Sequence, residues 1–286
     1  MTQLKIIKDR ITSAKETCKI TQAMKMVSAA KFKSASDTEL KSRQYMEKLS
    51  DVLTALVSQT DSQDSPLLSQ FPTAERICVI VVSGDRGLCG GFNTNLIKRL
   101  NAFLETQTQP VDFYFWGQKA HDFFKKSDIT IRGYETGLTN KTDISVISNL
   151  LEPILNEYIA GKYKSIEIIY TSFKSIISSV PVVKTILPFS IDDQNTRDSN
   201  SDYFIDPSPE VVMQSILKKY INLTAFRCIV ESFSAEQGAR MTAMDSATDN
   251  AKEVLSDLKL QYNRGRQAVI TTELSEIVAG SEALKQ

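Results

Sequence analysis

Proline is absent from both ends of this chain, because all eight prolines lie between Pro66 and Pro209, and the first glycine is Gly84. A proline inside a helix costs about 3 kcal/mol and a glycine about 1 kcal/mol relative to alanine. Residues 1–65 and 210–286 therefore contain nothing that must break a helix, and we expect a long helix in each. At ~1.5 Å per residue the second would extend roughly 110 Å, whereas a compact domain of this length has a radius of gyration of about 20 Å.

Other scarcities exclude several classes of site. His121 is the single histidine, so a histidine-based triad or a multi-histidine metal site cannot form within one chain, and we expect His121 to be packed or solvated. Uncharged apolar runs, such as residues 77–82, are far shorter than the ~20 residues that span a bilayer. Basic and acidic side chains balance at 34 each, which gives no reason to expect nucleic acid. The cysteines lack metal-ligand spacing and are expected to be reduced: Cys18, Cys78, Cys89 and Cys228.

Both ends carry an apolar stripe with helical spacing. Between Leu4 and Cys18 the apolar and small residues alternate steps of three and four, the spacing of a coiled-coil seam. A matching stripe runs through the C-terminal segment. Each stripe needs a partner, and an antiparallel pairing of the two ends supplies both partners within one chain. The stripes consist of Leu4, Ile7, Ile11, Ala14 and Cys18, and of Val230, Phe233, Met241, Met244, Ala247, Ala251, Leu255, Leu258, Tyr262 and Val269.

The middle of the chain has the pattern of an α/β domain. Residues 76–83 form a nearly continuous β-branched run, which is typical of a strand buried on both faces. Predicted strands then alternate with predicted helices, and this alternation indicates a mostly parallel, Rossmann-like sheet. Strands are expected at residues 76–83, 111–116, 129–134, 166–173 and 182–189, and helices at residues 92–104, 119–125 and 144–159, the last with a kink at Pro153.

The predicted fold class is α/β with long helices: an antiparallel coiled coil of the N- and C-terminal helices plus a Rossmann-like α/β domain. The N-terminal coiled-coil helix takes residues 1–59, and a polar linker with two prolines takes residues 60–75. The α/β domain covers residues 76–190, a polar surface loop covers residues 191–208, and the C-terminal coiled-coil helix covers residues 209–286.

A glycine-rich loop (residues 83–93, SGDRGLCGGFN) lies between the first strand and a helix, where α/β proteins often bind phosphate. A P-loop needs Lys and then Ser or Thr after its last glycine, but Phe92 and Asn93 stand there, and the G-x-G-x-x-G pattern is absent. We expect a tight turn with positive φ angles instead of a nucleotide site. No pattern in the sequence predicts a self-contained active site, and we expect no catalytic residue, cofactor or metal.

The N-terminal helix carries a surplus of positive charge, with eleven basic against five acidic residues between Lys5 and Lys48. An acidic partner explains the surplus, and so does a solvated helix face. Nucleic acid fits less well because aromatic residues are nearly absent from this segment. Near the C-terminus, Arg266, Gln267 and Thr271 place polar groups on one broad side of a helix. Such groups are able to bind loops of a surrounding protein, although ordinary surface residues have the same pattern.

Four stretches form long, specific motifs: TCKITQAMKMVSAAK at residues 17–31, the glycine-rich loop, EQGARMTAMDSATDN at residues 236–250 and RQAVITTELSEI at residues 266–277. Together they resemble the gamma subunits of F-type rotary ATP synthases. The resemblance covers the whole chain, and motifs of this length are very specific. Gly238 departs from the family, where alanine is usual, and a glycine inside a helix costs up to ~1 kcal/mol.

The resemblance implies a central-stalk rotor that catalyses no reaction itself. In the family the helix pair passes through a ring of alternating alpha and beta subunits. The foot of the helix pair and the α/β domain sit on the c-ring and bind the epsilon subunit. Proton flow turns the c-ring and this shaft, and the asymmetry of the shaft moves the beta sites through different affinities. Ion translocation is thereby coupled to ATP synthesis or hydrolysis.

By matching positions, the resemblance also implies contact residues. Two lie on the N-terminal helix, where they should face an acidic region of a beta subunit, and three lie near the C-terminus, where they should meet beta loops. A further pair falls where the family contacts the c-ring. These residues are Met24, Lys25, Arg266, Gln267 and Thr271 for beta subunits, and Tyr203 and Asp206 for the c-ring.

Residues 191–202 contain neither a cysteine nor a long insertion, so the thiol switch of the chloroplast branch is not supported. The start of the chain lacks the apolar core of a secretory signal and the acid-poor composition of a transit peptide. We therefore expect a bacterial complex, with this chain peripheral to the cytoplasmic face of the plasma membrane. The alternative from another class is a stand-alone α/β nucleotide-binding enzyme with a coiled-coil dimerisation arm. A passive coiled-coil scaffold is a third hypothesis.

Overall fold

The computed structural model of the chain describes residues 2–59, 67–69, 71–175, 178–189 and 209–283. The chain divides into two compact units. The first combines Met1–Ser28 with Met241–Gln286, and the second is Ala29–Arg240. Each unit therefore contains a part of both terminal segments, and the two units are described separately below.

Both terminal segments form long helices, as the scarcity of proline and glycine predicts. Helix α1 covers Thr2–Gln59 and helix α5 covers Pro209–Ala283. In the described part of the chain, five strands alternate with three shorter helices between them, and the predicted class of long helices with a mostly parallel sheet is confirmed. The elements are β1 Arg76–Val82, α2 Phe92–Thr106, β2 Val111–Trp116, α3 Gln118–Phe124, β3 Thr130–Glu135, α4 Ile144–Ile159, β4 Tyr163–Phe173 and β5 Ser179–Leu187.

The boundaries of the last two strands differ from the predicted ones. Strand β4 begins at Tyr163, three residues before the predicted start, because Tyr163 is fully buried although Lys162 and Lys164 surround it in the sequence. Strand β5 ends at Leu187, before the predicted end. Pro188 follows, and a proline has no N–H group to continue the ladder of hydrogen bonds.

The sheet of the second unit has the strand order β3-β2-β1-β4-β5. Strand β1 pairs in parallel with both β2 and β4, and β2 pairs in parallel with β3. Strand β5 is antiparallel to β4 and forms one edge. The order in which strands are added along the chain reverses beside β1, because β2 and β3 lie on one side of it and β4 and β5 lie on the other. This reversal is the place where open α/β sheets form a ligand crevice.

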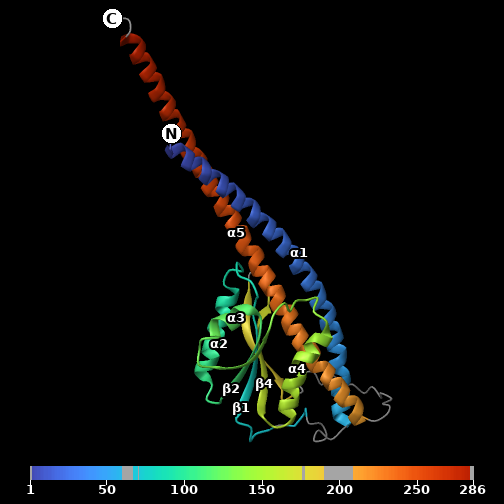
Figure 1. Cartoon of the computed structure of the whole chain (residues 1–286). Coiled ribbons are helices and arrows are strands. Elements are labelled where there is room, and N and C mark those ends of the chain that lie inside the picture. The colour runs from blue at the N-terminus through green and yellow to red at the C-terminus, as the bar shows by residue number, and fades with distance from the viewer. Residues whose placement is uncertain (1, 60–66, 70, 176–177, 190–208, 284–286) are drawn as a thin grey trace. The chain divides into compact units, whose positions relative to one another are not determined.

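Strand β1 is buried on both faces, as its β-branched run predicts. Ile77, Val79 and Val81 pack with residues of α2 and α3 on one face. Cys78 and Ile80 pack on the other face with residues of α4 and with the parts of α1 and α5 that belong to this unit. Figure 1 shows this layering, with α2 and α4 on opposite sides of the strands. The sheet is thus a central layer between two helical layers.

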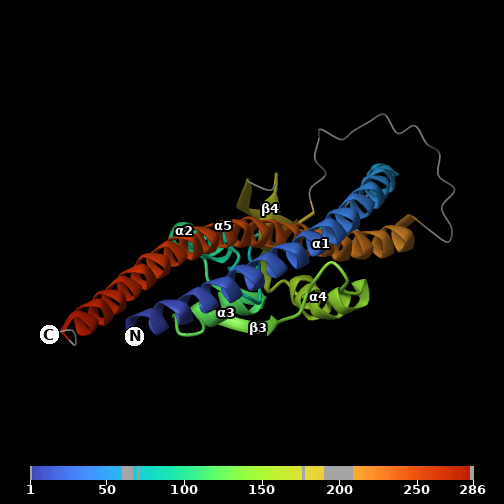
Figure 2. The ribbon, with the colours of Figure 1, turned by 90° about the horizontal axis from the view of Figure 1, so that it is seen from above.

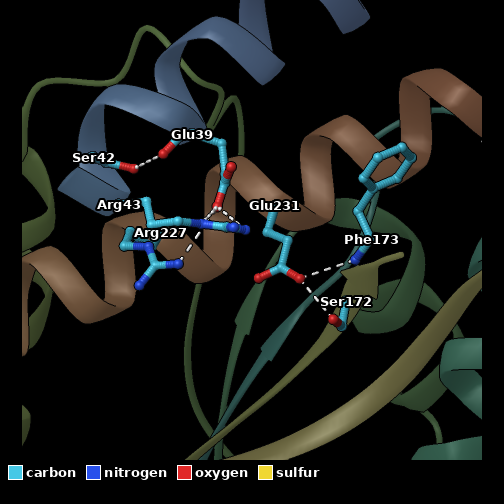
Figure 3. A network of polar contacts seen from close by, with 7 residues as sticks. All are labelled: Glu39, Ser42, Arg43, Ser172, Phe173, Arg227 and Glu231. Carbon is cyan, nitrogen blue, oxygen red and sulfur yellow. Dashed lines mark hydrogen bonds and ion pairs between the residues drawn. The ribbon is translucent and has the colours of Figure 1, made fainter. Parts of the chain in front are cut away.

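A polar network connects α1, α5 and β4 in the second unit (Figure 3). The Glu39 carboxylate of α1 accepts hydrogen bonds from two Arg43 nitrogens at 3.1 and 3.2 Å, and from Arg227 of α5 at 3.5 Å. One turn further along α5, the Glu231 carboxylate accepts from the Ser172 hydroxyl at 2.6 Å and from the Phe173 amide at 3.0 Å. Charged side chains are therefore paired both where α1 meets α5 and where α5 meets strand β4.

Candidate subunit-contact surfaces

The two helix segments of the first unit are antiparallel neighbours, and Figure 2 shows the first turns of α1 beside the C-terminal part of α5. Leu4 lies against Gly265, where an added Cβ would be 3.0 Å from the leucine side chain. Further along, the buried hydroxyl oxygens of Thr21 and Thr248 are 2.7 Å apart. Residue numbers rise along α1 while those of the partners on α5 fall. The predicted antiparallel pairing therefore holds within this unit, and Gly265 permits close approach of the backbones.

Lys25 makes an ion pair within the chain. Its ammonium nitrogen lies 2.5 Å from Oδ1 of Asp245, and the two side chains are 40% and 49% exposed. The family resemblance implies that Lys25 faces an acidic region of another subunit, and in this structure Lys25 is paired with an acid of α5. Met24 beside it is half-buried.

Exposed apolar side chains lie next to the predicted contact. Ile20, Met26 and Val27 are each more than half exposed. Ile20 and Val27 are two turns apart, with the exposed Ala23 between them, so they share one helix face. The seam of a coiled coil occupies one stripe of a helix, and Ile20, Ala23 and Val27 form a second stripe. This second stripe was not singled out from the sequence.

The positive charge of α1 is largely uncompensated. Among the described residues, the ion pairs of α1 cations involve Lys25, Arg43 and Lys48. The other basic side chains of α1 that the structure describes have no carboxylate within ion-pair distance. Both explanations of the surplus, an acidic partner and a solvated face, are compatible with this arrangement.

Arg266, Gln267 and Thr271 lie on the part of α5 beyond Gly265, and all of them are exposed. The Thr271 hydroxyl donates to the Gln267 backbone carbonyl oxygen at 2.9 Å, a bond within the helix. The same part of α5 has exposed apolar side chains at steps of four, three and one. They are Ile270, Leu274, Ile277 and Val278, which are 46 to 67% exposed.

This C-terminal apolar stripe was not predicted. Its spacing is typical of a helix face that packs against another part of a protein or against a partner. Leu4 of α1 lies opposite Gly265, and the stripe lies further along α5, where its members are exposed. A signal was available in the sequence, because apolar residues with helical spacing continue beyond Val269, the last residue of the predicted C-terminal stripe.

A groove of about 630 Å³ also runs along the helix pair of the first unit. Ala14, Ala247 and Ala251 keep it open, and Val254 adds an apolar wall. The remaining predicted contacts, Tyr203 and Asp206, lie outside the residues that the structure describes.

The glycine-rich loop lies at the carboxyl end of β1, beside the reversal of strand order. Positive φ angles, predicted for its glycines, occur at Gly90 (55°) and also at Leu88 (61°). Gly84 has another role, because a Cβ there would lie 3.1 Å from the carboxylate carbon of Glu236 on α5. The cavity that remains in this crevice measures about 10 Å³, the space of a single water molecule. Side chains of α5 thus occupy the place where such sheets bind ligands.

Three further observations bear on the class of site. In the described ranges, no three His, Cys, Asp or Glu side chains are close enough together to hold a metal ion. The imidazole of His121 stacks on the ring of Tyr134, with centroids 4.2 Å apart, so this histidine is packed. Among the helices of the described residues, none has an apolar stretch long enough to cross a membrane.

Comparison with known proteins shows similarity over the full length. The family model described as ATP synthase matches residues 3–284. A protein of Prosthecochloris aestuarii called ATP synthase gamma chain is 40% identical over 292 residues, covering 100% of this chain and 99% of the relative. A gamma chain of Bdellovibrio bacteriovorus is 37% identical over 295 residues, covering 100% of both.

Solved structures show the same fold at lower identity. A chain of the Euglena gracilis mitochondrial ATP synthase, in a structure of OSCP, F1 and c-ring, has a TM-score of 0.71 at 20% identity. The match covers 99% of this chain and 95% of that one. A chain of the rotor of the same organism's enzyme has a TM-score of 0.65 at 19% identity, covering 94% and 99%.

Proposed function

Because the chain belongs to the ATP synthase gamma chain family, we propose that it is the central-stalk rotor subunit of an F-type ATP synthase. Its partners are the alpha and beta subunits, the epsilon subunit and the c-ring. It carries torque between the ion-driven c-ring and the alpha/beta hexamer, and so couples ion translocation to ATP synthesis or hydrolysis. The chain itself is non-catalytic, and it lies at the cytoplasmic face of a bacterial plasma membrane, held there through the c-ring.

The observation that carries this proposal is the C-terminal apolar stripe on α5. Burial of an apolar side chain of this size stabilises by about 1.5–3 kcal/mol, so four such side chains exposed on one helix face indicate a surface that a partner covers. A rotor shaft enclosed by a ring of subunits supplies that cover. The polar groups of Arg266, Gln267 and Thr271 lie on the same segment, and we propose that they contact loops of beta subunits.

The contact that we propose between α1 and a beta subunit is more specific than the one that the resemblance implies. Because Lys25 is paired with Asp245, we propose that it acts mainly by holding α1 to α5. Met24 and the exposed apolar residues Ile20, Met26 and Val27 then meet the beta subunit, and the uncompensated lysines of α1 attract its acidic region. Tyr203 and Asp206 remain proposed contacts of the c-ring.

Affinity purification from native membranes through a tag on this chain tests the proposed function. We expect recovery of the alpha, beta, epsilon and c subunits in one complex that hydrolyses ATP. Recovery of the chain without these subunits would contradict the proposal. Leu274→Asp sharpens the test, because a charge on the C-terminal apolar stripe should weaken assembly or coupling. The same change should leave the melting temperature of the isolated chain nearly unaltered, since Leu274 is exposed.

A matched control lies on the same helix. Val254→Asp also puts a charge at a half-exposed apolar position of α5, but within the part that pairs with α1. It should lower the melting temperature of the isolated chain more than Leu274→Asp does. Equal assembly of the Leu274→Asp chain and the unchanged chain would show that the stripe is not a subunit contact.

A further inference from the structure

The crevice at the carboxyl end of the sheet contains a buried charge pair from α5. Glu236 and Arg240 are both 8% exposed, although charged residues are rarely buried to this degree. Both belong to the second unit, as do the sheet and the glycine-rich loop. They stand beside the reversal of strand order, where an α/β sheet usually receives a ligand from outside. The contacts of the pair show what holds it there.

Arg240 joins the pair to the loop. One of its terminal nitrogens donates to Oε1 of Glu236 at 2.5 Å and to the carbonyl oxygen of Gly87 at 3.2 Å. The Glu236 carboxylate lies against Gly84, where an added Cβ would come within 3.1 Å of its carboxylate carbon and 3.3 Å of Oε1. A residue larger than glycine at position 84 would push the carboxylate away. The loop is therefore shaped around an anionic group.

The surrounding charges identify what the crevice recognises. The pKa of Glu236 is raised above its usual value, mainly by burial and further by Asp85, whereas the cations Arg240 and Lys31 offset part of this rise. The Asp85 carboxylate is itself engaged, accepting from the amides of Gln118 at 3.0 Å and Gly137 at 2.8 Å. Arg240 is thus the buried cation that a carboxylate must satisfy. Without Glu236, a positive charge would remain in a space of carboxylate size.

We propose that this crevice is an anion site whose ligand is supplied by the chain itself. The carboxylate of Glu236, held by Arg240 against the glycine-rich loop, takes the place of an external ligand and fastens α5 to the sheet of the second unit. The class of ligand is a small carboxylate. The inference stands independently of the proposed function, because it concerns the isolated chain.

The competing explanation is an ion pair between neighbours on one helix, for which the crevice is incidental. The two differ in what happens when the carboxylate is removed. An anion site loses its ligand and should accept a replacement of the same chemistry. An ordinary i, i+4 ion pair on one helix has no such preference, because the anions of any salt would screen the charge of Arg240 equally well.

Thermal unfolding of the full-length chain with Glu236→Ala distinguishes them. Sodium formate replaces sodium chloride at constant ionic strength, so that only the chemistry of the anion changes. We expect formate to raise the melting temperature of Glu236→Ala by about 2–4 °C more than that of the unchanged chain, and the rise to saturate with concentration. Glu236→Gln fills the space without a charge, and formate should not rescue it.

Glu152→Ala is the matched control, because Glu152 also pairs with a cation of α5, Lys218, but on the surface. Formate should act on it as on the unchanged chain. An equal effect of formate on Glu236→Ala and Glu152→Ala would overturn the proposal.

If Glu236→Ala does not fold in formate, the double variant Glu236→Gln with Arg240→Met decides the matter. It removes both charges, so it should melt at a higher temperature than Glu236→Gln alone, which leaves Arg240 buried and unpaired. A double variant no more stable than the single one would also overturn the proposal.

Discussion

Asp112 is fully buried in strand β2, and its charge is met by residues far apart in the sequence. Arg76 donates to one carboxylate oxygen, and Arg132 donates to the other at 2.9 Å. The Tyr163 hydroxyl lies 3.1 Å from that second oxygen and 2.6 Å from Glu157. Burial raises the pKa of Asp112, but the hydrogen bonds from Arg76, Arg132 and Tyr163 outweigh it and hold the pKa below its usual value. The ionised form is therefore the native one.

Asp112→Asn should lower the free energy of unfolding by about 2 kcal/mol, measured from urea unfolding near pH 7. Removing one member of a fully buried pair costs about 3–5 kcal/mol, but the arginine partners are 32% and 41% exposed, so water offsets part of the loss. Because the folded pKa is depressed, the contribution of Asp112 is present above pH ~3.9 and is lost as the pH falls through the folded pKa. The variant should lack this part of the acid destabilisation. An acid profile parallel to that of the unchanged chain would contradict the assignment.

Gly117 illustrates a backbone requirement at the residue scale. It has a φ of 124°, and an added Cβ would overlap the carbonyl oxygen of Ser83. Gly117→Ala should therefore destabilise the chain by more than about 3 kcal/mol, because strain and overlap add. Gly87→Ala is the control, since nothing lies within 4 Å of its added Cβ and its φ is not in the left-handed region. Thermal unfolding of the two variants should separate clearly, and equal melting temperatures would refute the argument.

At the scale of elements, the helices α1 and α5 differ in how they are stabilised along their length. In the second unit they share a core with the sheet, through residues such as Leu53 and Leu217. In the first unit they meet through a narrow seam, with Thr21, Ser28, Met244 and Thr248 as its buried residues within the described segments. Small and polar side chains bury little apolar area, so individual contacts between the helices matter more there.

The pair Lys25 and Asp245 tests one such contact. Lys25→Asp and Asp245→Lys should each destabilise the helix pair, because each brings like charges together. The exchange of both should recover most of the loss, with a coupling free energy of about 0.5–1 kcal/mol, since both side chains are partly exposed. Thermal unfolding by circular dichroism at low and high salt measures it, and the coupling should shrink at high salt. Strictly additive effects would show that the two charges do not interact in solution.

At the scale of the whole molecule, the two compact units are stabilised in different ways. The second unit encloses a five-stranded sheet between helices, with two large apolar clusters on its faces. The first unit has two helix segments, and from Asp249 onward no described residue of α5 is buried. A gamma subunit that carries torque needs stiffness in both units, and we infer that enclosing subunits supply much of it to the first.

Hydrogen exchange of the isolated chain should therefore be uneven. Amides of α1 and α5 in the first unit should exchange at least about 100-fold faster than those of β1 and β4, because less apolar surface must be exposed to open them. Mass spectrometry of peptides after timed labelling measures the difference. In the assembled complex the protection of the first unit should rise. Equal protection of both units in the isolated chain would contradict this view of their stability.

The sequence alone determined the long helices, because a scarcity of proline and glycine acts locally on the backbone, and it determined the class of sheet through the buried run of β1. The strand order and the burial of Asp112 depended on the tertiary structure, since both arise from segments far apart in the chain. Lys25 shows the same limit: its charge is visible in the sequence, but its partner Asp245 is known only once α1 lies against α5. The C-terminal apolar stripe was visible as spacing, but its exposure was seen only in the tertiary structure. Likewise, the residues of the glycine-rich loop distinguish it from nucleotide-binding motifs, whereas only the tertiary structure showed that Glu236 and Arg240 of α5 lie in its crevice.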